Sequence, residues 1–230
     1  PFFFAAGSYA VIAMALWLGS IAGVITIPTM FNPVFWHAHE MLFGFVAAAI
    51  AGFLLTAIPN WTGRLPVHGP ALGLLVLVWL AGRIGVATSG IIGNWAAGFL
   101  DVSFLLLLSL VFCREIIAGK NWKNLVVVIP VFMLACVNTV IHGGMIGLWS
   151  NMTAEALFFG LFFVLLLLSV IAGRVIPSFT RNWLKQQNAS RFPVPFGRFD
   201  VFTTFAILIL LVVLMYGNDV WSGWIAAGVA

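Results

Sequence analysis

Long, almost uncharged apolar stretches recur along the chain, separated by short polar connections. A helix of about 20 apolar residues is long enough to cross the hydrocarbon core of a bilayer. About seven complete stretches have this length, and residues 224–230 resemble the start of an eighth. They lie at residues 3–27, 36–58, 70–88, 95–113, 125–142, 153–172 and 201–216.

The composition supports a membrane protein, because 63% of the residues are apolar and only 7% are charged. A soluble domain carries about 25% charged residues. The 22 Phe and 10 Trp are also far too many for a disordered chain. We therefore predict an all-α fold, a polytopic transmembrane helix bundle in which residues 1–230 form a single domain surrounded by lipid.

The basic residues predict the orientation of this bundle. Nine of the ten Lys and Arg lie in the second, fourth and sixth connections between the apolar stretches. Cytoplasmic loops carry such an excess, so these connections and the N-terminus are predicted to be cytoplasmic. The net charge of +4 is explained in this way and does not indicate nucleic-acid binding.

Ionisable residues within the apolar stretches gather toward the predicted outer side. They are His37, His39, Glu40, Arg83, Asp101, His142 and Glu155. Such groups are costly in hydrocarbon and often mark functional sites. They can also be interfacial groups, or ion pairs that hold helices together, and Arg83 with Asp101 or Glu155 is such a pair. For these three residues individually, the packing interpretation is favoured.

The histidines are the best candidates for a metal site. On a helix His37 and Met41 share a face, whereas His39 points nearly the opposite way. Two ligand pairs are therefore open, His37 with Met41 or His39 with His142, because imidazole and thioether both bind transition metals. Asn138 lies four residues before His142 and could orient that imidazole. Histidines that only form hydrogen bonds within the helix packing are the other interpretation.

Several motifs closely resemble those of the NnrS family of bacterial membrane proteins. They are WHAHEMLFGF at 36–45, AGFLLTAIPNWTGR at 51–64, LAGR at 80–83, NWKNL at 121–125 and GRVIPSFTRNW at 173–183. The resemblance implies a bundle of about twelve helices in the bacterial inner membrane. It also implies an association with haem, copper and the genes of denitrification and nitric-oxide stress. Family members are longer, so the chain is expected to be the N-terminal part of a longer protein.

These observations predict a protein of the nitric-oxide response that binds haem b and copper near the periplasmic side. The proposed metal ligands are His37, His39, Met41 and His142. Glu40 and Arg83 would orient haem propionates or relay protons. An oxidoreductase that acts on nitric oxide, a non-enzymatic haem or nitric-oxide binding protein, and an accessory subunit that works with other membrane or redox subunits all remain open.

A transporter of a small solute or ion, without a metal cofactor, is the alternative from another functional class. It is motivated by proline breaks expected at Pro59 and Pro177 and by a faint internal similarity between residues 40–62 and 155–180. Transporters usually place broken helices and polar groups near the membrane midplane. Here the midplane segments are apolar, which favours the metal protein.

Overall fold

The computed structural model describes residues 1–149 and 153–216, and these residues form helices and connections without a strand. The predicted all-α fold is confirmed. The chain divides into two compact units, residues 1–160 and residues 161–230. The expected eighth stretch from Trp224 onward lies outside the described residues.

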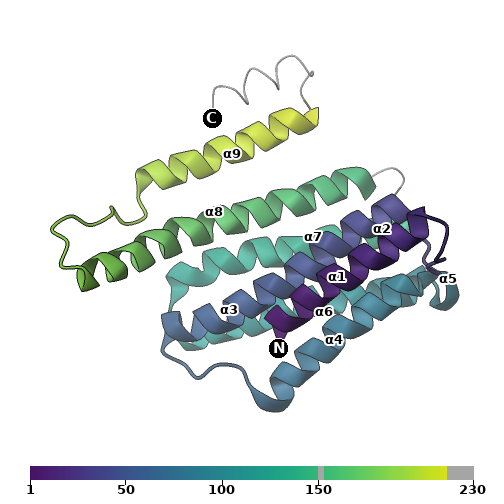
Figure 1. The fold of residues 1–230 in the computed structure, drawn as a ribbon, viewed down its shortest axis with the longest axis horizontal. Coiled ribbons are helices and arrows are strands. Elements are labelled where there is room, and N and C mark those ends of the chain that lie inside the picture. Colours follow the sequence, from purple (N-terminus) through teal and green to yellow (C-terminus); the bar gives the residue numbers. More distant parts are fainter. Residues whose placement is uncertain (150–152, 217–230) are drawn as a thin grey trace. The chain divides into compact units, whose positions relative to one another are not determined.

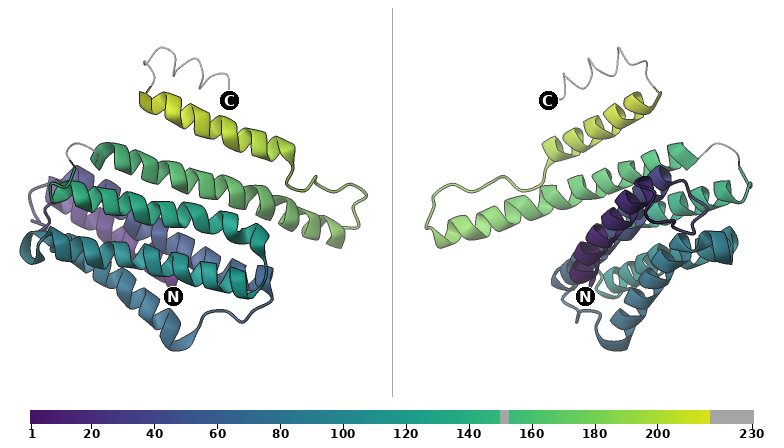
Figure 2. Two further views of the ribbon diagram at one scale, coloured as in Figure 1. Left: turned by 180° about the vertical axis from the view of Figure 1, so that it is seen from behind. Right: turned by 45° about the vertical axis from the view of Figure 1, so that its right-hand side comes forward.

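The first unit is a bundle of helices (Figure 1). In chain order its elements are α1 (Phe2–Ile21), α2 (Pro33–His39), a π-helix (Glu40–Val46), α3 (Ala47–Thr62), α4 (Gly69–Ala87), α5 (Ser89–Ile92), α6 (Asn94–Ala118), a 3₁₀-helix (Trp122–Val127), α7 (Val128–Met145) and the start of α8 (Thr153–Gln186). α6 packs against α3, α4 and α7, while α1 packs against α2, the π-helix and α3. The views in Figure 2 also show α6 beside α4 and α7.

Six helical segments among the described residues are long and apolar enough to cross a membrane. They are Phe2–Ile21, Pro33–Thr62, Gly69–Ala87, Asn94–Ala118, Trp122–Met145 and Glu155–Gln186. Each corresponds to one of the first six predicted stretches. The seventh stretch coincides with α9 (Arg198–Tyr216), a helix that is not among these six.

Two predicted helix ends are wrong, because Pro59 and Pro177 lie inside α3 and α8. Proline is tolerated in membrane helices when neighbouring groups bond to the freed backbone. Near Pro59, the Asn60 amide donates to the Thr56 carbonyl at 3.1 Å. α3 instead ends at Gly63, whose φ of 68° is the left-handed conformation that glycine adopts at helix ends.

α6 also extends beyond its prediction. It continues to Ala118, so Arg114 lies in the helix and not in the connection that follows it. α2 begins at Pro33, three residues before the predicted start at Trp36, because Asn32 accepts a hydrogen bond from the Phe35 amide at 2.9 Å and Pro33 occupies the first turn.

The second unit contains the larger part of α8 together with α9. Within it, the hydroxyls of Ser169 and Thr204 lie 2.7 Å apart and join these helices. The Arg174 guanidinium of α8 lies 5.8 Å from the centre of the ring of Phe196, a residue in the connection between α8 and α9.

Candidate metal centre

Seven polar side chains from six elements meet inside the first unit. We call them the ionic cluster: Tyr9, His39, Glu40, Arg83, Asp101, Asn138 and His142. All except the half-buried Tyr9 are at most 5% exposed. They lie near the start of α6 and the end of α7.

Arg83 joins the two carboxylates of the cluster. Its Nη1 donates to Glu40 Oε2 at 2.7 Å, and its Nη2 donates to Asp101 Oδ1. The Tyr9 hydroxyl donates to the same Glu40 oxygen. The ion pair predicted between Arg83 and Asp101 therefore forms. Arg83 also pairs with a second carboxylate, that of Glu40. Glu155, the other predicted partner, is exposed.

Asp101 and Asn138 link the two histidines. The Asn138 amide donates to Asp101 Oδ2 at 2.8 Å, and its carbonyl oxygen lies 3.0 Å from His39 Nε2. His142 Nε2 lies 3.0 Å from the same Asp101 oxygen. Asn138 thus orients His39 directly, and its effect on His142 passes through Asp101. The spacing of four residues on α7 placed Asn138 on the correct face but did not indicate its partner.

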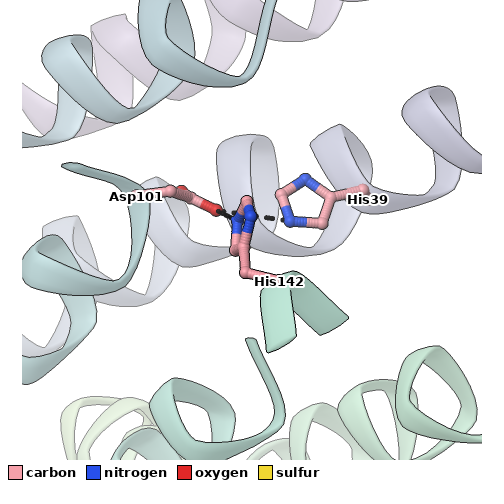
Figure 3. A group of neighbouring side chains, drawn as sticks. All are labelled: His39, Asp101 and His142. Carbon is pink, nitrogen blue, oxygen red and sulfur yellow. Dashed lines mark hydrogen bonds and ion pairs between the residues drawn. The ribbon is translucent and has the colours of Figure 1, made fainter. Parts of the chain in front are cut away.

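His39, Asp101 and His142 form a group that could hold a metal ion (Figure 3). One ligand atom from each residue lies within 4.8 Å of the other two. Asp101 Oδ2 is 3.3 Å from His39 Nε2 and 3.0 Å from His142 Nε2. Bonds of about 2.0–2.2 Å to one ion place neighbouring ligand atoms about 3.0–3.5 Å apart. The two separations that involve Asp101 therefore already suit one ion, and the two histidine nitrogens lie within 4.8 Å of each other.

The charge of the cluster also favours a cation. Two buried carboxylates, Glu40 and Asp101, share one guanidinium, which leaves one net negative charge when both imidazoles are neutral. A buried charge without compensation is strongly unfavourable. A monovalent cation would neutralise this charge, and a divalent cation would change it to one positive charge. Glu40 Oε1 lies 3.1 Å from His39 Nδ1 and would hold the far side of a metal-binding imidazole, as is usual around metal sites.

A haem does not fit between His39 and His142. Two axial imidazoles lie on opposite faces of a porphyrin, which requires the space between their nitrogens to be free for the ring. Here the Asp101 carboxylate is in hydrogen-bonding distance of both. Both terminal nitrogens of Arg83 are also engaged, so the predicted role of Arg83 and Glu40 in orienting haem propionates is not supported by this geometry.

A π-helix begins at Glu40, directly after His39. Such wide turns are rare and often occur at functional sites. The carbonyl of Gly44, within this segment, accepts a hydrogen bond from the buried Trp79 indole at 3.0 Å. A Cβ at Gly44 would lie only 3.0 Å from Glu40 Oε2 and 3.1 Å from Arg83 Nη1. The glycine therefore makes room for the Glu40–Arg83 contact.

His37 and Met41, the other predicted metal ligands, are not among the residues of the ionic cluster. The His37 ring stacks on Trp17 with 4.0 Å between ring centres, and its Nδ1 is buried without a hydrogen-bond partner. Met41 is half-buried. His37 and His39 thus face different neighbours, as their spacing predicted. Metal binding by His37 or Met41 stays a prediction.

The sequence analysis missed two contributions to this site. Tyr9 lies within an apolar stretch, and nothing in the pattern around it indicated a carboxylate partner. Asp101 was considered as a partner of Arg83 but not as a metal ligand. Its register against α2 and α7 depends on packing between distant segments, which no local motif encodes.

An apolar pocket of about 290 Å³ lies beside the cluster, between α6 and α7. Its walls include Trp95, Phe99 and Trp149, and His142 forms part of its lining. The Nδ1 atom of His142 is buried and has no hydrogen-bond partner. One imidazole therefore contacts Asp101 through Nε2 and also contributes to the wall of this pocket.

Comparison with known proteins identifies the family. No curated protein and no solved structure matches the chain. A family model described as NnrS protein matches residues 1–230, the whole chain. With six helices of membrane-spanning length and a match of this extent, the chain is a multi-pass membrane protein that belongs to the NnrS family.

Proposed function

We propose that this protein binds a single transition-metal ion through His39, Asp101 and His142 and acts in the bacterial response to nitric oxide. The observation that carries the proposal is the buried group of two imidazoles and one carboxylate, with ligand atoms within 4.8 Å of one another. The nitric-oxide role rests on the family resemblance. We further propose an inner-membrane location with the N-terminus in the cytoplasm and the cluster toward the periplasm, based on the distribution of Lys and Arg.

Copper is the first candidate for the ion. Imidazole nitrogen binds copper well, and the family resemblance implies copper. Two imidazoles and a carboxylate are also the ligand set of many non-haem iron sites. Thioether would favour Cu(I), but Met41 is not among the three residues of the group. A copper site at His37 and Met41 is therefore the less favoured proposal. Metal analysis distinguishes copper from iron.

The remaining residues of the cluster would position the ligands. Glu40 fixes the His39 ring through Nδ1, and the Asn138 side-chain amide holds Asp101. Arg83 offsets one of the two carboxylate charges, so a bound Cu(I) would make the cluster neutral and a divalent ion would leave one positive charge. A bound copper or iron ion would supply a redox-active centre with a coordination position for nitric oxide. Three protein ligands leave such a position open.

Metal analysis of the full-length protein, purified in detergent, tests the proposal. We expect about one copper or iron per chain in the wild type, and at least tenfold less in His39→Gln and in His142→Gln, because each loses a ligand nitrogen. His68→Gln is the matched control, since His68 is exposed and lies outside the cluster. A wild-type protein without bound metal, or equal metal content in all three variants, would overturn the proposal.

The visible spectrum of the same preparations tests the predicted haem. A haem gives a Soret band, and the cluster leaves no room for a porphyrin between its imidazoles. We therefore expect any Soret band to persist in His39→Gln, which would indicate axial ligands elsewhere in the protein. Loss of the band in this variant, with the fold intact, would contradict the assignment of His39 to a metal ion alone.

Turnover is tested separately from binding. Anaerobic consumption of nitric oxide by the metal-loaded protein with a quinol donor would indicate an enzyme. Binding of nitric oxide without consumption would indicate a binding protein or an accessory subunit. The transporter alternative receives no support from its proline argument, because Pro59 and Pro177 lie inside continuous helices.

A further inference from the structure

The apolar pocket beside His142 has the features of a ligand site and not only of a packing defect. Binding pockets are lined mostly by apolar and aromatic side chains, with a few polar groups that fix orientation. Here Trp95, Phe99 and Trp149 are exposed aromatic wall residues. The pocket volume of about 290 Å³ is near the lower limit for small-molecule sites, which suits one substituted ring.

Two residues that line the pocket carry a buried polar atom without a hydrogen-bond partner, His142 Nδ1 and Asn94 Oδ1. His142 is 5% exposed, and its Nδ1 has no hydrogen-bond partner among the described residues. A buried polar atom without a partner is unusual and calls for an explanation. Gly98 also lines the pocket, and a Cβ there would lie 3.2 Å from this Nδ1. The absence of a side chain at Gly98 therefore leaves space beside the unpaired nitrogen.

The chemistry of the imidazole indicates which ligand fits. When Nε2–H donates to Asp101, Nδ1 is an acceptor and suits a hydroxyl. When Nε2 binds a metal ion, Nδ1 carries the hydrogen and suits a carbonyl. A quinone and its quinol offer these two groups on the same planar ring. Their flat faces can also stack on Trp and Phe side chains.

We propose that this pocket binds the ring of a membrane-soluble quinone or quinol, with a ring oxygen hydrogen-bonded to His142 Nδ1. The inference extends the proposed function, because such a ring would contact a residue that we assign as a metal ligand. A purely apolar molecule would leave Nδ1 unpaired, and a charged molecule would find few polar partners in the pocket. The site would therefore favour a neutral ring with one or two oxygens.

Photolabelling of the full-length protein in lipid nanodiscs tests this inference. The probe is a short-tailed azidobenzoquinone, and the labelled peptides are identified by mass spectrometry. We expect label within residues 94–106 and 139–149, and at least tenfold less label in Ser103→Trp, whose side chain would fill the pocket. Leu110→Trp is the matched control, because Leu110 is exposed on the same helix and does not line the pocket.

Thermal unfolding and metal content are measured on the same samples. If Ser103→Trp unfolds, Thr139→Met fills the pocket from α7 and replaces it. Label spread evenly over the apolar surface, or equal labelling of the wild type and a folded pocket variant, would overturn the inference. A metal-loaded wild type without pocket label refutes the quinone site and leaves the metal site standing. Pocket label in a protein without metal supports the quinone site while the proposed function fails.

Discussion

Two ionic groups lie near opposite ends of α6 and differ mainly in burial. At one end, Asp101 and Arg83 belong to the ionic cluster, where their side chains are 1% and 3% exposed. At the other end, Glu115 pairs with Arg64 at 2.7 Å, but Arg64 is 38% exposed. A bundle that needed only helix-to-helix contacts could use pairs of the second kind. Burying several charged side chains in one place is costly, which suggests a functional reason for the cluster.

Arg83→Met tests the buried group most severely. The variant leaves Glu40 and Asp101 without their shared cation, and breaking a buried pair costs about 3–5 kcal/mol. We expect a much lower yield of folded protein and a clearly lower midpoint of thermal unfolding in detergent. A variant as stable as the wild type would show that the carboxylates are not held charged by Arg83.

Tyr9→Phe removes one hydrogen bond to the charged Glu40 and keeps the ring. Hydrogen bonds to charged groups contribute about 1.5–3 kcal/mol. We expect a moderate loss of stability in the same unfolding measurement. No loss would mean that the Tyr9 hydroxyl finds an equivalent partner, and the cluster would then be less dependent on α1 than the contacts indicate.

Gly44→Ala tests how tightly the cluster is packed. The added Cβ would lie 2.5 Å from Tyr9 Cε1, so the Tyr9 ring must shift, and it would also crowd Glu40 Oε2 at 3.0 Å and Arg83 Nη1 at 3.1 Å. Overpacking of this kind costs about 1–3 kcal/mol. Gly73→Ala is the matched control, because a Cβ at this position of α4 would meet nothing within 4 Å. Equal unfolding midpoints for the two variants would contradict close packing at Gly44.

Arg64→Met should have the smallest effect. Glu115 is buried but keeps a second cation, because Arg114 Nε lies 3.4 Å from its Oε1, and the lost partner Arg64 is 38% exposed. Exposed ion pairs contribute about 0–1 kcal/mol, and the loss of Arg64 belongs near this range. We expect an unfolding midpoint within a degree or two of the wild type, by the same reasoning. An effect as large as that of Arg83→Met would remove the distinction between the two ends of α6.

The sequence predicted the all-helical fold and the approximate position of each apolar stretch, because length and hydropathy determine which segments can span a bilayer. It was less accurate at helix ends. Pro59 was expected to stop a helix, but Thr56 and Asn60 bond to backbone carbonyls around it and α3 continues to Thr62.

The candidate site was only partly predictable. The opposite orientations of His37 and His39 follow from helical periodicity, and pairing His39 with His142 was one of two open possibilities. The register between distant helices was not available from spacing. For this reason the carboxylate that joins the histidines, Asp101, and the hydroxyl of Tyr9 became visible only in the folded arrangement.

X-ray absorption at the edge of the bound metal reports which atoms of the protein bind the ion. We expect a first shell of nitrogen and oxygen at about 2.0–2.2 Å, with the outer-shell scattering of two imidazoles. Asp101→Asn should change this shell or abolish metal binding, whereas Glu155→Gln, at an exposed carboxylate, should not. A sulfur shell at about 2.3 Å, or a spectrum unaffected by Asp101→Asn, would contradict a metal ion held by His39, Asp101 and His142.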